Sequence, residues 1–156
     1  MTNITIAKPV PDFEADATGD LHFKLSDYLG KKIIIYFYPR DNTPGCTLEG
    51  KAFRDNIEQF NALNVVIFGV SRDSVKVHEG FKKKQAFPFE LLSDKEEKLC
   101  RLFDVIKMKN MYGKQVRGIE RSTFLINEDG VLLYEWRKVK VKTHIEEILQ
   151  KLAEHS

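Results

Sequence analysis

Five closely spaced residues, Pro39, Thr43, Pro44, Gly45 and Cys46, combine types that could carry out nucleophilic chemistry. Thr43 is a favoured N-cap residue and proline is favoured at the first helical position, so a helix is predicted to begin at Pro44. Cys46 then lies in the first helical turn, where backbone N–H groups and the helix dipole favour a thiolate over a thiol. Such a thiolate would be a nucleophile with an anion-binding site already around it.

The same stretch has a plainer interpretation, an ordinary capped helix that carries a small apolar residue. In either case we expect the Thr43 hydroxyl to accept a hydrogen bond from a backbone N–H two or three residues on. Gly45 leaves no side chain beside the sulfur and lets the backbone approach a small ligand. A free cysteine taken alone is more often a core residue than a nucleophile, so these residue types leave the choice open.

The flanking segments make this stretch a strand-to-helix turn. The apolar run over 33–37 predicts a buried strand before it, and residues 48–63 predict an amphipathic helix after it. A second apolar run over 65–70 follows the helix. Two buried strands joined by a helix form a βαβ unit, which places the strands parallel and adjacent in one sheet.

The remaining segments complete an α/β pattern. Two β-hairpins are predicted, one over 13–25 around Gly19-Asp20 and one over 122–136 around residues 127–130. The other expected elements are an irregular lead-in over 1–11, a helix over 71–85 capped by Ser74, a strand or extended link over 87–92, a short helix opened by a capping box at 93–96, a polar loop over 107–118, a strand with one charged face over 137–142 and a helix over 143–155. We therefore predict a single α/β domain over residues 1–156. Its central mixed sheet, flanking helices and N-terminal hairpin extension are the layout of a thioredoxin-like fold.

Composition and charge argue against several classes of protein. The chain has 156 residues, of which 42% are hydrophobic and 31% charged, as in an ordinary globular domain. Its net charge of +2 gives no reason to expect a nucleic-acid or membrane partner. The basic alternation over 137–142 could form a nucleic-acid strip, but no interleaved aromatic residues support that alternative.

Location and cofactors are constrained in the same way. No apolar run approaches the roughly 20 residues of a membrane span, and residues 1–10 lack the basic start and apolar core of a signal peptide. Two cysteines cannot form a disulfide framework, so a cytoplasmic location is expected. The histidines at 22, 78, 144 and 155 show no metal-ligand spacing, so we expect neither a metal nor another cofactor.

Several stretches of the chain resemble the peroxiredoxins, in particular the subgroup of the bacterioferritin comigratory protein, or peroxiredoxin Q. They follow one another in the family's order along nearly the whole chain, over residues 37–47, 69–73, 92–94, 110–114 and 118–126. The resemblance implies a thiol peroxidase that reduces hydrogen peroxide and organic hydroperoxides through a sulfenic acid. It favours the nucleophilic interpretation of the cysteine over the core-filling one.

The resemblance also implies roles for individual residues. Cys46 matches the peroxidatic cysteine, and Arg121 matches the arginine that would hold the thiolate and stabilise charge on the peroxide oxygens. Thr43 would accept the proton of the peroxide and donate to the attacked oxygen. Pro39 would shield the sulfur from bulk water.

A resolving cysteine is missing from both positions where such relatives carry it. One position is Lys51, and the other lies near residues 81–83, where no cysteine occurs. Cys100 is the only remaining candidate, and its apolar neighbours favour core packing over resolution. The alternative is a one-cysteine cycle, in which thioredoxin, glutaredoxin or glutathione attacks the sulfenate. The resemblance points to a monomer or a weak homodimer.

Two other functions use the same cysteine. A redox sensor or holdase would be oxidised at Cys46 and change its binding to a partner protein. A thioredoxin-like disulfide reductase is disfavoured, because Thr43 stands where such a protein has the first cysteine of its Cys-x-x-Cys motif.

Overall fold

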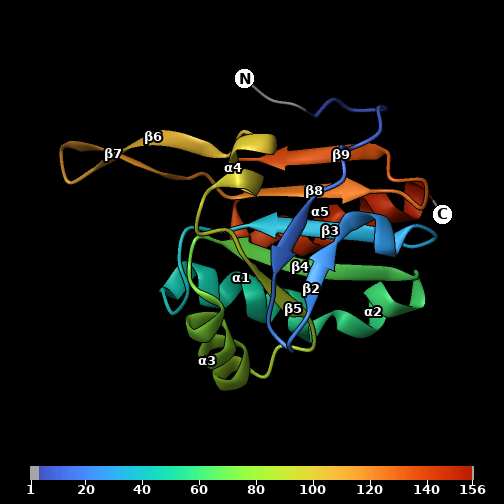
Figure 1. Cartoon of the computed structure of the whole chain (residues 1–156), viewed down its shortest axis with the longest axis horizontal. Coiled ribbons are helices and arrows are strands. Elements are labelled where there is room, and N and C mark those ends of the chain that lie inside the picture. The colour runs from blue at the N-terminus through green and yellow to red at the C-terminus, as the bar shows by residue number, and fades with distance from the viewer. Residues whose placement is uncertain (1–3, 156) are drawn as a thin grey trace.

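A mixed β-sheet forms the centre of the protein (Figure 1). The computed structural model describes residues 4–155, and within them this sheet has five strands in the order β5-β4-β3-β8-β9. The strands are β3 (Lys32–Phe37), β4 (Val65–Ser71), β5 (Glu90–Ser93), β8 (Ser122–Ile126) and β9 (Leu132–Arg137). The first three are parallel, whereas β8 and β9 run antiparallel to their neighbours. The predicted βαβ unit and second hairpin are thereby confirmed.

The central strand β3 is buried on both faces, which explains its continuous apolar sequence. Ile33, Ile35 and Phe37 belong to one hydrophobic core. Ile34 and Tyr36 point the opposite way and belong to a second core. The sheet therefore separates two cores, and each must be covered by other elements.

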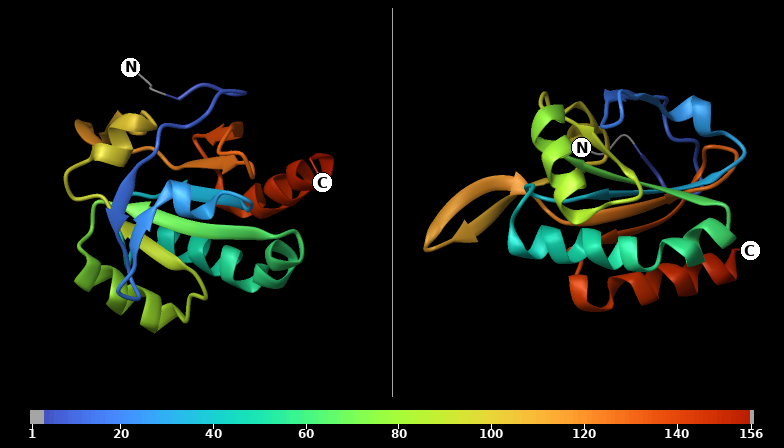
Figure 2. Two further views of the ribbon diagram at one scale, coloured as in Figure 1. Left: turned by 45° about the vertical axis from the view of Figure 1, so that its right-hand side comes forward. Right: turned by 90° about the horizontal axis from the view of Figure 1, so that it is seen from below.

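Three helices cover one face of the sheet: α1 (Pro44–Asp55), α2 (Ile57–Ala62) and α5 (Val141–Glu154) (Figure 2, right). The single helix expected over 48–63 is interrupted at Asn56, which ends α1 and precedes α2. Its side-chain Nδ2 donates to the Ala52 carbonyl oxygen at 2.8 Å, an alternative to the regular helical bond. None of the helices within residues 4–155 has the length and apolar character needed to cross a bilayer.

The opposite face is covered by the predicted N-terminal hairpin, β1 (Glu14–Asp16) with β2 (His22–Lys24), and by the 3₁₀-helix η1 (Leu25–Tyr28) and helix α4 (Lys98–Leu102). The core beneath them contains aromatic contacts, in which the Phe13 ring packs against both Phe23 and Phe103. The lead-in carries neither helix nor strand over residues 4–11, and its first three residues lie outside the described part.

Helix α3 (Val75–Gln85) lies along β5 and is capped as expected, since Ser74 Oγ accepts from the Val77 N–H at 3.2 Å. It begins four residues later than predicted. Ser71 instead continues β4 and pairs with Ser93 of β5. The sheet partner overrides the local tendency of this segment to be helical.

The predicted capping box at 93–96 is wrong. Helix α4 begins only at Lys98, after Glu97 in the left-handed conformation with φ 62°. The Asp94 carboxylate instead accepts from the N–H groups of Leu99 and Cys100, at 3.0 and 2.8 Å. An aspartate five residues upstream therefore satisfies donors that a local cap would have satisfied.

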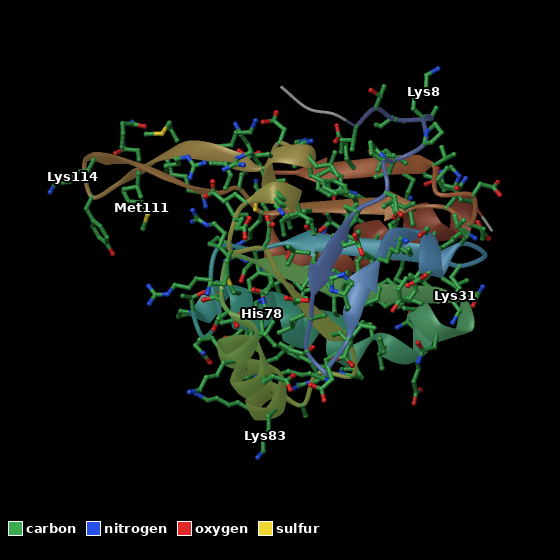
Figure 3. The ribbon with its side chains drawn as sticks, in the orientation of Figure 1. Lys8, Lys31, His78, Lys83, Met111 and Lys114 are labelled. Atoms are coloured by element: carbon green, nitrogen blue, oxygen red, sulfur yellow. The ribbon has the colours of Figure 1, made fainter. Side chains whose placement is uncertain are left out.

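The polar loop expected over 107–118 is also wrong, because this segment forms a hairpin of β6 (Ile106–Met111) and β7 (Lys114–Ile119). The hairpin projects from the body of the protein, with Met111 and Lys114 at its tip (Figures 1 and 3). Both faces of its outer part are exposed, so no alternation of apolar and polar residues marked it as a strand pair. Tyr112 and Gly113 have the positive φ angles, 54° and 80°, of a two-residue hairpin turn.

The charged strand expected over 137–142 is wrong as well. Strand β9 ends at Arg137, Lys138 turns the chain with φ 51°, and α5 begins at Val141. Arg137 donates to the carbonyl oxygens of Phe103 and Asp104, at 2.8 and 2.7 Å. The alternation of charged residues and valine therefore spans a strand end, a turn and a helix start.

Candidate active site

Cys46 lies in the first turn of α1, directly beyond the end of β3. The N-cap is Thr43 in an extended conformation, and Pro44 occupies the first helical position, as predicted. The cysteine is only 1% exposed. A strand end and a helix start thus hold a buried sulfur beside the N–H groups of the first helical turn.

The Thr43 hydroxyl does not act as the predicted cap. Within the described chain it makes no capping hydrogen bond, and its proton is donated to the Arg40 carbonyl oxygen at 2.8 Å. The hydroxyl oxygen keeps its two lone pairs. Thr43 therefore presents an acceptor at the start of α1, and the first-turn N–H groups are left to other partners.

Arg121 approaches Cys46 from the loop that enters β8. Its Nη2 lies 3.3 Å from the Cys46 Sγ, and its Nη1 donates to Glu49 Oε1 at 2.9 Å. The backbone is fixed here because the Val139 N–H donates to the Arg121 carbonyl oxygen at 3.1 Å. Although burial disfavours the charged guanidinium, Cys46 and Glu49 raise the pKa of Arg121. The side chain therefore stays positively charged at any pH at which the protein is folded and active.

Gly45 makes room for this arginine. A Cβ atom on Gly45 would lie 2.7 Å from Arg121 Nη2, closer than real Cβ contacts occur. The sequence had suggested that this glycine admits a small ligand. The structure shows that it admits the guanidinium group that contacts the sulfur.

Glu49 belongs to the site and was missed in the sequence. Its side chain is 1% exposed, and burial raises its pKa to about 7 against the opposing effect of Arg121. Among the described residues, its Oε2 has no hydrogen-bond partner. The available signal was its position three residues after Cys46, which places both on one helical face.

Pro39 is half-buried in the bend between β3 and α1. The half-buried Lys109 of β6 is close enough to interact electrostatically with Arg121 and Cys46. Burial, and then Arg121, lower the pKa of Lys109, while Cys46 opposes them. The β6–β7 hairpin therefore adds a second cation beside the site.

A buried polar network underlies the loop that carries Thr43. Asp41 accepts from the Tyr38 hydroxyl at 2.6 Å, and its other oxygen lies 2.6 Å from His78 Nδ1. The opposite ring nitrogen of His78 lies 2.8 Å from the Leu92 carbonyl oxygen, so that nitrogen is the donor. His78 is a residue of α3, and its side chain lies on the side of the helix that faces the sheet (Figure 3). The network ties the active-site loop to α3 and β5.

Asp41, Asp73 and His78 also form the group of metal-capable side chains found among residues 4–155, with donor atoms within 4.8 Å of one another. Hydrogen bonds within the group and to neighbouring residues occupy these atoms, as in a network that holds the loop in place. The spacing of the histidines in the sequence had given no sign of it.

Cys100 lies in the opposite core from Cys46. It is fully buried in α4, among residues of the core under the N-terminal hairpin, whereas Cys46 belongs to the core under α1 and α5. Burial, and then Asp94, raise the pKa of the Cys100 thiol. Both cysteines are free thiols in the part of the chain described. The structure thus does not bring the two together.

A thioredoxin-like sheet that presents a buried cysteine at a helix N-terminus, next to a fixed arginine, defines the class of thiol-dependent peroxidases. The chain belongs to the AhpC/TSA family, whose model matches residues 6–135. Within it, the chain is 53% identical over 153 residues to peroxiredoxin Bcp of Bacillus subtilis, covering 98% of both chains. It is 48% identical to peroxiredoxin Bcp of Xanthomonas campestris, covering 100% of this chain and 99% of the relative. The predicted family is confirmed.

Solved structures agree with this assignment. Peroxiredoxin Q of X. campestris matches with a TM-score of 0.90 at 48% identity, covering 99% of both chains. The bacterioferritin comigratory protein of X. campestris, studied for its alkyl peroxide reduction activity, matches with a TM-score of 0.87 at 50% identity, covering 92% of this chain and 91% of that one. The thioredoxin-like fold is confirmed, and the chain is a thiol peroxidase.

Proposed function

We propose that Cys46 is the peroxidatic residue of this peroxidase. The observation that carries the proposal is the 3.3 Å contact between Arg121 Nη2 and the Cys46 Sγ at the start of α1. A fixed cation and a helix N-terminus on one sulfur favour the thiolate, which is the nucleophilic form. The substrates are hydrogen peroxide and organic hydroperoxides.

In the oxidative step the Cys46 sulfur attacks one peroxide oxygen. The new S–O bond takes its electron pair from sulfur, and the O–O pair leaves with the other oxygen. That oxygen takes up a proton and departs as water or an alcohol, leaving a sulfenic acid on the enzyme. Arg121 stabilises the charge that develops on the oxygens, the Thr43 hydroxyl oxygen accepts a hydrogen bond from the peroxide O–H, and Pro39 limits access of water.

The reductive step uses a single enzyme cysteine. An external thiol attacks the sulfenic sulfur, releases water and forms a mixed disulfide, which a second thiol then resolves. Thioredoxin, glutaredoxin or glutathione can supply both thiols. The placement of Cys100 in the other core supports this cycle, because a disulfide requires Cα atoms within about 7 Å.

The same proposal includes an oligomeric state and a cellular location. The protein acts as a monomer or a weak homodimer, in the cytoplasm, with residues 1–156 forming one domain. Two free thiols and no framework of disulfides support a reducing compartment.

A peroxide sensor or holdase remains the alternative, since a sulfur that is 1% exposed in the reduced protein needs an opening before a partner can reach it.

The test is peroxide consumption with thioredoxin and its reductase present. Cys46→Ser should abolish consumption, and Arg121→Ala should slow the oxidation of Cys46 by about a hundredfold. Cys100→Ser is the matched control and should keep the wild-type rate. Full activity in Cys46→Ser would refute the proposal, and a wild-type protein that is oxidised once and then stalls would favour the sensor.

A further inference from the structure

The peptide group between Arg40 and Asp41 links Thr43 to the loop that follows β4. Its carbonyl oxygen accepts the Thr43 hydroxyl at 2.8 Å, while its N–H donates to Asp73 Oδ2 at 2.9 Å. A trans peptide group is planar and rigid, so whatever fixes the direction of the N–H also fixes the direction of the carbonyl. Asp73 and Thr43 therefore hold opposite ends of one rigid unit.

Asp73 is itself held firmly. Its Oδ2 accepts from the Ser71 hydroxyl at 2.5 Å, and its carbonyl oxygen accepts from the Ser93 hydroxyl at 2.6 Å. Ser71 and Ser93 face each other on β4 and β5. The carboxylate that anchors the peptide group is thus fixed to the edge of the central sheet.

The Asp41 side chain provides a second anchor for the same unit. One carboxylate oxygen accepts from Tyr38 and the other contacts His78, both at 2.6 Å, and Asp41 is only 4% exposed. The residue after the peptide group therefore cannot rotate without breaking a buried network. Asp73 fixes the orientation of the peptide plane, and Asp41 fixes its position.

We propose that Asp73 is a positioning residue for the peroxide step, acting on the Thr43 hydroxyl through the Arg40–Asp41 peptide group. This inference rests on the proposed function, because it takes the Thr43 hydroxyl oxygen to accept a hydrogen bond from the peroxide O–H. The Thr43 proton is committed to the Arg40 carbonyl oxygen. A lone pair is thereby aimed in a direction set by the peptide plane. The hydrogen bond that it accepts orients the peroxide for attack by the sulfur, and the rate of such an attack depends steeply on geometry.

The test is a double-mutant cycle on the rate at which peroxide oxidises Cys46 in a single turnover. Asp73→Ala should slow that rate by about tenfold in the wild-type background, because the peptide N–H loses its acceptor. In the background of Thr43→Val, which has no hydroxyl to position, the same change should slow the rate less than about twofold. Asp73→Asn retains an acceptor oxygen and should restore most of the rate.

Two controls separate positioning from loosening of the structure. Alkylation of Cys46 by iodoacetamide reports access and nucleophilicity but involves no peroxide O–H for Thr43 to orient, so Asp73→Ala should leave it unchanged. Ser74→Ala removes the cap of α3 next to Asp73 without touching the peptide group, and should leave peroxide oxidation unchanged. If Asp73→Ala does not fold, Ser71→Ala removes the hydroxyl that holds the carboxylate and should show the same dependence on Thr43.

An equal loss of rate with and without the Thr43 hydroxyl would overturn the proposal, as would a loss of alkylation that parallels the loss of peroxide reactivity. An unchanged rate in Asp73→Ala would also overturn it. Failure of the proposed function has a different signature, since peroxide would then leave Cys46 of the wild-type protein unoxidised or would still be consumed by Cys46→Ser.

Discussion

The guanidinium group of Arg121 contacts two acceptors, a sulfur and a carboxylate. Nη2 contacts the Cys46 sulfur, and Nη1 contacts a Glu49 carboxylate that is almost fully buried. An ionised carboxylate in such a place is costly unless it is fully paired, and Glu49 Oε2 has no partner among the described residues. The residue that orients Arg121 is thus also a source of instability.

Glu49 should make the stability of the protein fall as the pH rises. Its pKa is raised from 4.5 to about 7 in the folded protein, so the folded state binds more protons than the unfolded state between those values. Relative to Glu49→Gln, wild type should lose about 3 kcal/mol across this window and nothing further above it.

Urea denaturation at about pH 4 and about pH 8 measures this difference. Glu58→Gln, which changes an exposed carboxylate on α2, is the matched control and should follow wild type at both pH values. A difference between Glu49→Gln and wild type that stays constant with pH would contradict the expectation.

At the scale of the elements, the β6–β7 hairpin is held to the body by Glu97. The carboxylate receives both terminal nitrogens of Arg117 from β7, at 2.7 and 2.6 Å, and Arg72 from the end of β4 at 3.0 Å. These bonds, from Arg117 first, lower the pKa of Glu97 to about 2 against the effect of burial. One side chain therefore joins the hairpin, α4 and the loop that contains Asp73.

Glu97→Gln should loosen the hairpin without unfolding the sheet. We expect backbone amides of β6 and β7 to exchange hydrogen several-fold faster, on the order of three- to tenfold, with β3 and β4 unchanged. Lowering the pH should loosen the hairpin of the wild-type protein in the same way, because folding lowers the pKa of Glu97. The stabilisation is present above about pH 4.5 and is lost as the pH falls towards about 2. Glu96→Gln, at an exposed neighbour, is the control, and an equal effect there would assign the change to surface charge alone.

At the scale of the whole molecule, the central sheet places the two cysteines in separate cores. Cys46 packs on one face of the sheet with α1 and α5, and Cys100 packs on the other face with α4. Joining them would require one helix to leave its core, because strands β3 and β4 contribute large side chains to both faces. The architecture therefore favours a cycle that is completed by another molecule.

Intact mass after one equivalent of hydrogen peroxide distinguishes the two cycles. We expect the gain of a single oxygen, trapped on Cys46 by a sulfenate reagent, in wild type and Cys100→Ser alike. Loss of two hydrogens in wild type, absent from Cys100→Ser, would instead demonstrate a Cys46–Cys100 disulfide and a large opening of the fold.

Much of this architecture was predictable because its signals are local. The helix start at Pro44, the parallel pair β3 and β4, and the hairpins at both ends of the chain follow from turn residues and from the period of apolar residues. The β6–β7 hairpin and the start of α4 were mispredicted, since exposed strands lack periodicity and the donors of α4 are satisfied by the more distant Asp94.

The sequence by itself determined the local setting of Cys46, because Thr43, Pro44 and Cys46 are close together in the chain and form one helix start. Only the tertiary structure decided what surrounds that sulfur. Arg121 reaches it across 75 residues of chain, and Gly45 leaves room for that approach. Asp73 accepts from the N–H of the peptide group whose carbonyl oxygen accepts from Thr43. These contacts join residues distant in sequence, and they exist only once β3, β4 and β8 lie side by side in the sheet.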